Sequence, residues 1–196
     1  MADKENDVIV RHIAPAIAAA RTIGLPIIYT NNSAPRIAIH RSELGRIARR
    51  SFELEWEEWG QEANVDPREY ALGEPDALKF PTRLEPEDGD YFVRKHSYSG
   101  FFETRLDGLL RNLGIKTLVC VGFSLDVCLH STMVDAMSLN YEIVLVRDAT
   151  LAQEMPEDLD ELRFTKRLIV LAEYSLGVST TSAAFIAACT SAAGTP

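Results

Sequence analysis

The fold is decided by the stretch KTLVCVGFSLDVCLHSTMVDAMSLNYEIVLVRD, residues 116–148. It begins with an apolar run at 116–122 and ends with a second one at 142–148. Each run has the length and composition of a strand that is buried on both faces. The residues between them, from about Val127 to Leu139, have the apolar spacing of a helix. Two buried strands joined by a helix form a βαβ unit, which predicts a parallel sheet.

The alternation of strand and helix continues on both sides of this unit. The first helix should be bent or interrupted near Pro15, and Gly114 should end the helix that precedes the βαβ unit. Further strands are expected at 25–30, 91–95 and 174–179, and further helices at 4–23, 103–114, 156–172 and 181–189. The predicted fold class is therefore α/β, a three-layer α/β/α sandwich with a mainly parallel sheet of the Rossmann-like kind.

The chain of 196 residues has the size of one domain. We therefore expect residues 1–196 to form a single domain. Residues 33–89 are rich in Pro, Glu, Arg and Trp and show little periodicity apart from a candidate helix at 41–50. A long irregular stretch within a compact domain is usually functional. We expect it to form a lid-like excursion.

Composition and charge exclude several classes of protein. Apolar residues make up 46% and charged residues 25%, an ordinary globular balance that excludes a disordered chain. The formal net charge of −9 argues against nucleic acid as a partner. No apolar run is long enough to cross a membrane, and MADKENDVIV is no signal peptide, so we expect a cytoplasmic protein. Its three cysteines are too few and too widely spaced for a disulfide framework.

Two residues at strand ends are candidates for catalysis. Cys128 follows an apolar strand and a short turn, at the expected start of a helix, where backbone N–H groups and the helix dipole stabilise a thiolate. Lys95 ends another expected strand and should lie at the same edge of the sheet, where its charge would favour that thiolate. The alternatives are an inert buried cysteine and a solvated lysine.

Neighbouring polar and aromatic residues could form a small substrate pocket. Tyr98 and Phe102 lie in the segment before a helix, and Asn32 could offer its amide to a polar substrate or cap a turn. The four histidines stand apart, and the sequence has neither a glycine-rich dinucleotide motif nor a phosphate-binding loop. We therefore expect no metal and no cofactor.

Residues 95–150 closely resemble the isochorismatase-like cysteine hydrolase superfamily, and especially its ureidoacrylate amidohydrolase branch. The pattern K-x-x-Y-S-G-F-F-x-T-x-L-D stands at 95–107, and G-x-x-x-x-V-C-x-x-S-T stands at 122–132. The segments RTIGLPIIYTNN and HRSELGR look like the same branch. The likeness covers nearly the whole chain and is weak between Phe52 and Pro81.

The resemblance implies roles for several residues. Cys128 would be the nucleophile and Lys95 its cationic partner in a Cys-Lys-Asp triad. A cis peptide bond would fall at Phe123-Ser124, and the N–H groups of Ser124 and Cys128 would hold the oxyanion. The positions that match the family's substrate pocket are Asn32, Tyr98 and Phe102. The implied reaction is hydrolysis of a linear C–N bond in a small ureido, carbamoyl or amide substrate, and the implied assembly is a homo-oligomer.

One part of the family pattern has no counterpart. The family's aspartate ends a first strand, which would lie between the strands expected at 25–30 and 116–122. This sequence begins about where the family's first helix begins, and Asp3 and Asp7 do not match that aspartate. We expect a gap in the parallel sheet at that place. Asp126 is a poor substitute base, so the alternative function is a catalytically impaired homologue that binds a ligand or pairs with other subunits.

Overall fold

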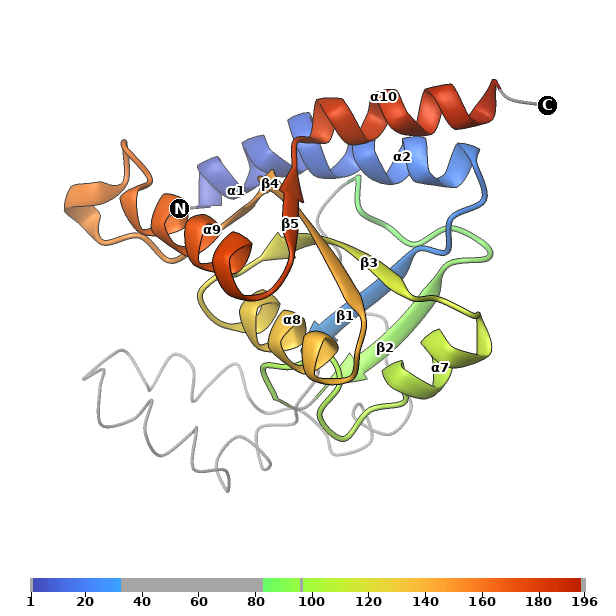
Figure 1. Cartoon of the computed structure of the whole chain (residues 1–196). Coiled ribbons are helices and arrows are strands. Elements are labelled where there is room, and N and C mark those ends of the chain that lie inside the picture. Colours follow the sequence, from blue (N-terminus) through green and yellow to red (C-terminus); the bar gives the residue numbers. More distant parts are fainter. Residues whose placement is uncertain (1, 33–82, 96, 195–196) are drawn as a thin grey trace, which may run out of the picture.

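The computed structural model describes residues 2–32, 83–95 and 97–194 (Figure 1). The expected alternation of helices and strands is present. The strands are β1 (Ile28–Asn32), β2 (Tyr91–Lys95), β3 (Thr117–Phe123), β4 (Glu142–Leu151) and β5 (Val178–Thr180). The helices are α1 (Ala2–Val8), the π-helix η1 (Ile9–Ile13), α2 (Ala14–Thr22), α7 (Leu106–Asn112), α8 (Cys128–Ser138), the 3-10 helix η3 (Pro156–Asp158), α9 (Arg163–Ser175) and α10 (Ser182–Ala193).

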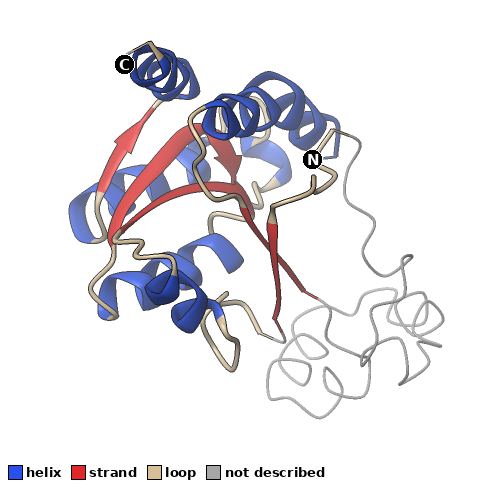
Figure 2. Ribbon diagram, turned by 90° about the vertical axis from the view of Figure 1, so that its right-hand side faces the viewer, coloured by secondary structure: helices blue, strands red, loops and turns tan. Residues whose placement is uncertain are grey.

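Helices cover both faces of the strands, which confirms the three-layer arrangement (Figures 1 and 2). Every strand pair among the described residues is parallel: β1 with β2, β3 with β4, and β4 with β5. On one face, side chains of α7, α8 and α9 form a core around Leu110, Met133 and Leu145. On the other face, Ile9 and Ile13 of η1 pack against β4. The α/β fold class is thus confirmed.

The described strands form two separate sheets, β1-β2 and β3-β4-β5. Within residues 2–32, 83–95 and 97–194, no strand pairs with β3 on the side away from β4, or with β1 on the side away from β2. The expected gap between β1 and β3 is therefore present. The edges of β1 and β3 that face this gap are open, and their backbone N–H and C=O groups form no ladder with another described strand.

The expected interruption of the N-terminal helix near Pro15 is confirmed: the helix widens into η1 just before it, because proline has no N–H to donate to the preceding turn. Several other expected boundaries were wrong. Strand β1 begins at Ile28 and includes both asparagines instead of ending before them. Strand β4 continues to Leu151, and β5 is only Val178–Thr180 because α9 runs on to Ser175. The candidate helix at 41–50 and most of the excursion at 33–89 lie outside the described residues.

The start of α9 is fixed by a buried carboxylate that the sequence did not indicate. Glu154 accepts hydrogen bonds from the backbone N–H groups of Phe164, at 3.0 Å, and Thr165, at 2.7 Å. Burial would raise the pKa of Glu154, but the hydrogen bonds from Thr165 and Phe164 outweigh it and lower the pKa overall. The helix therefore begins after 160, later than its apolar pattern suggests.

Replacing Glu154 by glutamine should make the free energy of unfolding depend less on pH in the acidic range. Because the folded protein lowers the pKa of this carboxyl, its contribution is present above the ordinary glutamate pKa of about 4.3 and is lost as pH falls through the lower folded value. We expect Glu154→Gln to lower the free energy of unfolding at pH 7 by about 1–2 kcal/mol and the difference to shrink towards pH 3. Urea unfolding across this range measures it. A constant difference, or an equal effect of the exposed-site control Glu157→Gln, would contradict the assignment.

Gly177 allows the end of α9 to approach β4 closely. A Cβ built on Gly177 would lie 2.3 Å from the carbonyl oxygen of Ile143, a backbone atom that cannot move aside. We expect Gly177→Ala to lower the free energy of unfolding by at least about 2 kcal/mol, measured by thermal unfolding. The control is Gly108→Ala in α7, where an added Cβ meets no atom within 4 Å and alanine favours the helix. Equal melting temperatures for the two variants would be inconsistent with this close approach.

Candidate active site

Cys128 is the first residue of α8, as expected, and is half-buried. The chain reaches it through a tight turn after β3. In this turn the carbonyl of Ser124 accepts hydrogen bonds from the N–H groups of Val127, at 3.3 Å, and Leu129, at 3.0 Å. The peptide bond Phe123-Ser124 is cis, as expected. The thiol therefore stands where the first N–H groups of a helix and its dipole favour an anion.

The turn before Cys128 is supported by the end of β4. After an irregularity between Cys120 and Gly122, β3 pairs again with Thr150 and Leu151. The Thr150 hydroxyl donates to the Gly122 carbonyl at 2.7 Å, and the Leu125 N–H donates to the Leu151 carbonyl at 2.8 Å. The sequence predicts this strand only as far as Asp148, so the support from Thr150 and Leu151 was not predicted.

Lys95 is the last residue of β2 and is only 3% exposed. Its ammonium donates to the carbonyl of Ser97 at 3.0 Å. Among the residues that the structure describes, no carboxylate forms an ion pair with it. A buried ammonium is costly without a counter-charge, so this site favours an anion close to the end of β2. The alternative of a solvated surface lysine is thus wrong.

The loop after Lys95 is held against the first turn of α8. The Gly100 N–H donates to the Thr132 hydroxyl at 2.9 Å, and that hydroxyl donates to the Cys128 carbonyl at 2.7 Å. A side chain on Gly100 would meet Thr30, Leu106 and Thr132 at 3.2–3.3 Å, so three elements converge there. Thr132 was not singled out as a site residue, although the Ser-Thr pair after the cysteine in the sequence pattern is a signal for it.

Tyr98 lies within electrostatic reach of Cys128. Burial raises the pKa of the Tyr98 phenol, and a thiolate at Cys128 and the Asp126 carboxylate raise it further. Asp126 itself is engaged elsewhere, because it accepts a hydrogen bond from the Gln153 N–H at 3.1 Å. Tyr98 is therefore close enough to Cys128 for their charges to interact, whereas Asp126 is bound to the loop after β4.

The other two expected pocket residues, Asn32 and Phe102, have no described interaction with the Cys128 thiol. Asn32 ends β1, beside Lys95 in the strand register. Phe102 is 55% exposed in the turn before α7. Its neighbour Phe101 instead packs against Tyr141, with ring centroids 5.8 Å apart. None of the described interactions links Phe102 to Cys128.

The remaining thiols differ from Cys128 in their surroundings. Cys120 is buried in β3, and burial raises its pKa to about 12. Cys189 is buried in α10. At neutral pH Cys120 is therefore protonated and unreactive, which fits a purely structural residue.

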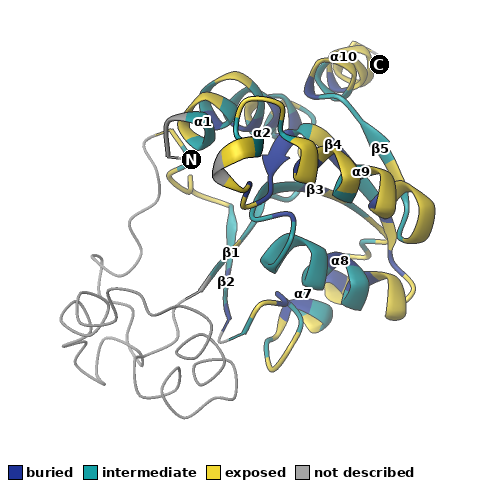
Figure 3. Ribbon diagram, turned by 90° about the vertical axis from the view of Figure 1, so that its left-hand side faces the viewer, coloured by how far each residue is buried: buried dark blue, intermediate teal, exposed yellow. Residues whose placement is uncertain are grey.

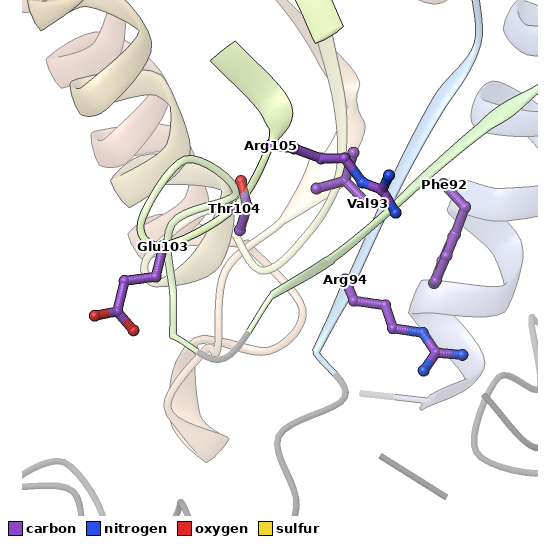
Figure 4. A pocket seen from close by; sticks show the side chains of 6 residues that line it. All are labelled: Phe92, Val93, Arg94, Glu103, Thr104 and Arg105. Atoms are coloured by element: carbon purple, nitrogen blue, oxygen red, sulfur yellow. The ribbon is translucent and has the colours of Figure 1, made fainter. Parts of the chain in front are cut away.

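A cavity of about 290 Å³ lies between β2 and the residues just before α7 (Figure 4). It is lined by Phe92, Val93, Arg94, Glu103, Thr104 and Arg105. No described group of three or more His, Cys, Asp or Glu side chains could hold a metal ion. Of the described helices, none combines the length and the apolar character that a membrane span needs.

Comparisons with known proteins agree with the fold. Residues 1–165 match the Isochorismatase domain family. The ureidoacrylate amidohydrolase RutB of Agrobacterium fabrum is 32% identical over 151 residues, which cover 72% of this chain and 61% of that protein. RutB of Methylobacterium radiotolerans is 34% identical over 152 residues, covering 77% and 57%. The chain thus spans less than two thirds of the length of these curated relatives.

Solved structures share the architecture. A cysteine hydrolase from Pseudomonas syringae pv. phaseolicola superposes with a TM-score of 0.73 at 24% identity, covering 96% of this chain and 83% of that one. N-carbamoylsarcosine amidase from Thermoplasma acidophilum superposes with a TM-score of 0.57 at 28% identity, covering 87% and 80%. Taken with the match over residues 1–165, the parallel α/β fold and the cysteine at the start of α8 identify this chain as a member of the isochorismatase family.

Proposed function

We propose that the chain is a cysteine-dependent amidohydrolase that cleaves a linear C–N bond in a small ureido, carbamoyl or amide substrate. Two observations carry the proposal: a half-buried thiol, Cys128, begins α8, and a buried lysine without a described carboxylate partner, Lys95, ends β2. The names of two relatives, ureidoacrylate amidohydrolase and N-carbamoylsarcosine amidase, support this class of substrate. We also propose a single domain without metal or cofactor and, from its free cysteines, a cytoplasmic location.

In the proposed reaction, the Cys128 thiolate attacks the carbonyl carbon of the substrate. The backbone N–H groups of Ser124 and Cys128 receive the oxyanion, and the Lys95 ammonium stabilises both the thiolate and the developing charge. Collapse of the tetrahedral intermediate breaks the C–N bond and leaves a thioester-like carbonyl on sulfur. The nitrogen takes a proton from a water molecule and leaves as ammonia or an amine, and the resulting hydroxide attacks the thioester-like carbonyl, which releases the acid product and the Cys128 thiolate. Asn32, Tyr98 and Phe102 are proposed to contact the substrate.

The test is the release of ammonia or amine from linear ureido, carbamoyl and simple amide compounds, compared with cyclic analogues. We expect release from linear substrates only. An absence of release from every linear compound by the folded protein would refute the proposed reaction.

The gap beside β3 supports a second candidate function, a ligand-binding or subunit-pairing protein without turnover. In the family the proton-transferring aspartate belongs to the strand that would fill this gap. Alkylation distinguishes the two candidates. A catalytic Cys128 should react with iodoacetamide at neutral pH much faster than Cys120 and Cys189, as measured by mass spectrometry. Slow and equal labelling of all three thiols would favour the binding function.

A further inference from the structure

The hydroxyl of Thr132 connects two parts of the proposed active site that are far apart in the sequence. It accepts a hydrogen bond from the Gly100 N–H at 2.9 Å and donates one to the Cys128 carbonyl at 2.7 Å. Gly100 belongs to the loop after Lys95, and Cys128 begins α8. Figures 1 and 3 show the loop between β2 and α7 next to α8. A single side chain therefore joins the helix of the proposed nucleophile to the loop that follows the buried lysine.

The bond from Thr132 to the Cys128 carbonyl is by itself ordinary. Serine and threonine side chains within a helix often donate to the carbonyl four residues earlier. The hydroxyl of Ser138 does so in α8, and that of Thr190 does so in α10. Of these three hydroxyls, only that of Thr132 also accepts a hydrogen bond from a distant described residue, 32 positions away. This second bond is a connection that helix geometry does not require.

Gly100 is fixed at both of its backbone polar groups. Its N–H donates to Thr132, and its carbonyl accepts from the hydroxyl of Thr104. That hydroxyl accepts in turn from the N–H of Leu106, the first residue of α7. Gly100 is buried, and a Cβ on it would lie 3.2–3.3 Å from side-chain atoms of three other residues. The loop therefore has little room to change its position relative to α7 and α8.

The same short loop carries the hydrogen-bond acceptor of Lys95. The Lys95 ammonium donates to the Ser97 carbonyl at 3.0 Å. Ser97 and Gly100 are three residues apart, so at most about 11 Å of chain separates them. Tyr98, which lies within electrostatic reach of Cys128, stands between them. A shift of Gly100 relative to α8 would therefore move both the carbonyl that orients the ammonium and the Tyr98 ring relative to the thiol.

We propose that Thr132 is a positioning residue of the active site, whose hydroxyl fixes the loop after Lys95 at the distance from α8 at which the ammonium stabilises the Cys128 thiolate. The inference rests on the proposed function, because it takes Cys128 as the nucleophile and Lys95 as its cationic partner. Electrostatic stabilisation depends on preorganised distances, and a misplacement of about 1 Å can lower a rate by as much as about 10²-fold. The loss of one hydroxyl outside the reacting atoms should therefore be measurable at the thiol.

Alkylation of Cys128 tests whether Thr132 acts through Lys95. Thr132→Val keeps the shape of the side chain and removes its hydroxyl. We expect this change to slow the reaction of Cys128 with iodoacetamide about 10-fold. In a Lys95→Met background the same change should slow it by less than about twofold, because the cation that Thr132 positions is already absent. Equal slowing in the two backgrounds would overturn the proposal.

Two further variants separate the connection from a general effect on helices. Thr132→Ser keeps the hydroxyl, so its Cys128 should react nearly as fast as that of the natural protein. Thr190→Val makes the same substitution and removes the same kind of helix bond in α10, and it should leave the rate unchanged. Slow alkylation in Thr132→Ser, or equal slowing in Thr190→Val and Thr132→Val, would contradict a positioning role.

Hydrogen exchange tests the connection without any reaction. The Gly100 amide should exchange at least about 10-fold faster in Thr132→Val than in the natural protein, as measured by NMR, with circular dichroism confirming the fold. Unchanged exchange would overturn the proposal even if the chain is an active enzyme. Faster exchange in Thr132→Val, together with no ammonia release by the natural chain, would support the connection and refute the proposed reaction.

Gly100→Ala provides a test that keeps Thr132 intact, in case the valine variant does not fold. The added Cβ meets close neighbours, among them Thr132 itself, and should displace the loop from α8. We expect slower alkylation of Cys128 than in the control Gly108→Ala, where an added Cβ meets no atom within 4 Å. Equal rates in the two folded alanine variants would count against the proposal.

Discussion

Replacing Cys128 by serine is expected to lower kcat/KM for ammonia release by at least about 10³-fold. The size of the loss follows from the surroundings of the thiol. In the proposed site the start of α8 and the Lys95 cation stabilise an anion, and a thiol loses its proton far more readily than a hydroxyl. A serine hydroxyl has a far higher pKa and would need a strong base, which the described residues next to Cys128 do not include. Steady-state kinetics with the best linear substrate measures the effect.

The control for this variant is Cys189→Ala, which removes a thiol in α10 far from the turn and should leave kcat/KM nearly unchanged. Thermal unfolding should show that Cys128→Ser is as stable as the natural protein, since the side chain is only half-buried. If Cys128→Ser were nearly as active as the natural chain, the Cys128 thiol would not be the nucleophile. This conclusion would hold whatever the activity of Cys189→Ala.

Replacing Lys95 by methionine is expected to change activity and stability in opposite directions. Methionine keeps the length of the buried side chain and removes its charge. Loss of the cation should lower kcat about 10²–10³-fold, because thiolate and oxyanion lose an electrostatic partner in a site with little water. The free energy of unfolding should stay equal or rise by about 1 kcal/mol, because the cost of burying an ammonium disappears.

The measurements are kcat, the rate of Cys128 alkylation and urea unfolding. Alkylation should slow in Lys95→Met because the reacting thiolate loses a stabilising cation. The control Arg94→Met removes the neighbouring charge from the same strand, where side chains alternate between the two faces. If Lys95→Met lost stability but kept its alkylation rate, Lys95 would be a structural residue and not part of the active site.

The sequence was sufficient for features set by neighbouring residues. The helix α8, its start at Cys128 and the order of strands all follow from local apolar patterns that the structure confirms. The position of Lys95 at the end of β2 is equally local, since YFVRK is a short uninterrupted strand.

Features that depend on distant partners were not predicted. The extension of β4 to Leu151 depends on Gly122 and Phe123, which pair with it only after the irregularity in β3. The start of α9 depends on Glu154, eleven residues before Thr165. The role of Thr132 as a bridge between Gly100 and Cys128 depends on a loop 32 residues away. No periodicity within one segment contains this information.

The open edge of β3 also affects how the protein behaves at high concentration. β3 is TLVCVGF, seven residues without a charge or a proline, and no described strand covers its outer edge. Such a segment is a template for edge-to-edge pairing between chains and has the composition of aggregation-prone strands. The strand that leads into the turn before Cys128 is thus also a site for pairing between chains, so we expect storage lifetime, measured by thioflavin fluorescence, to be limited by this strand.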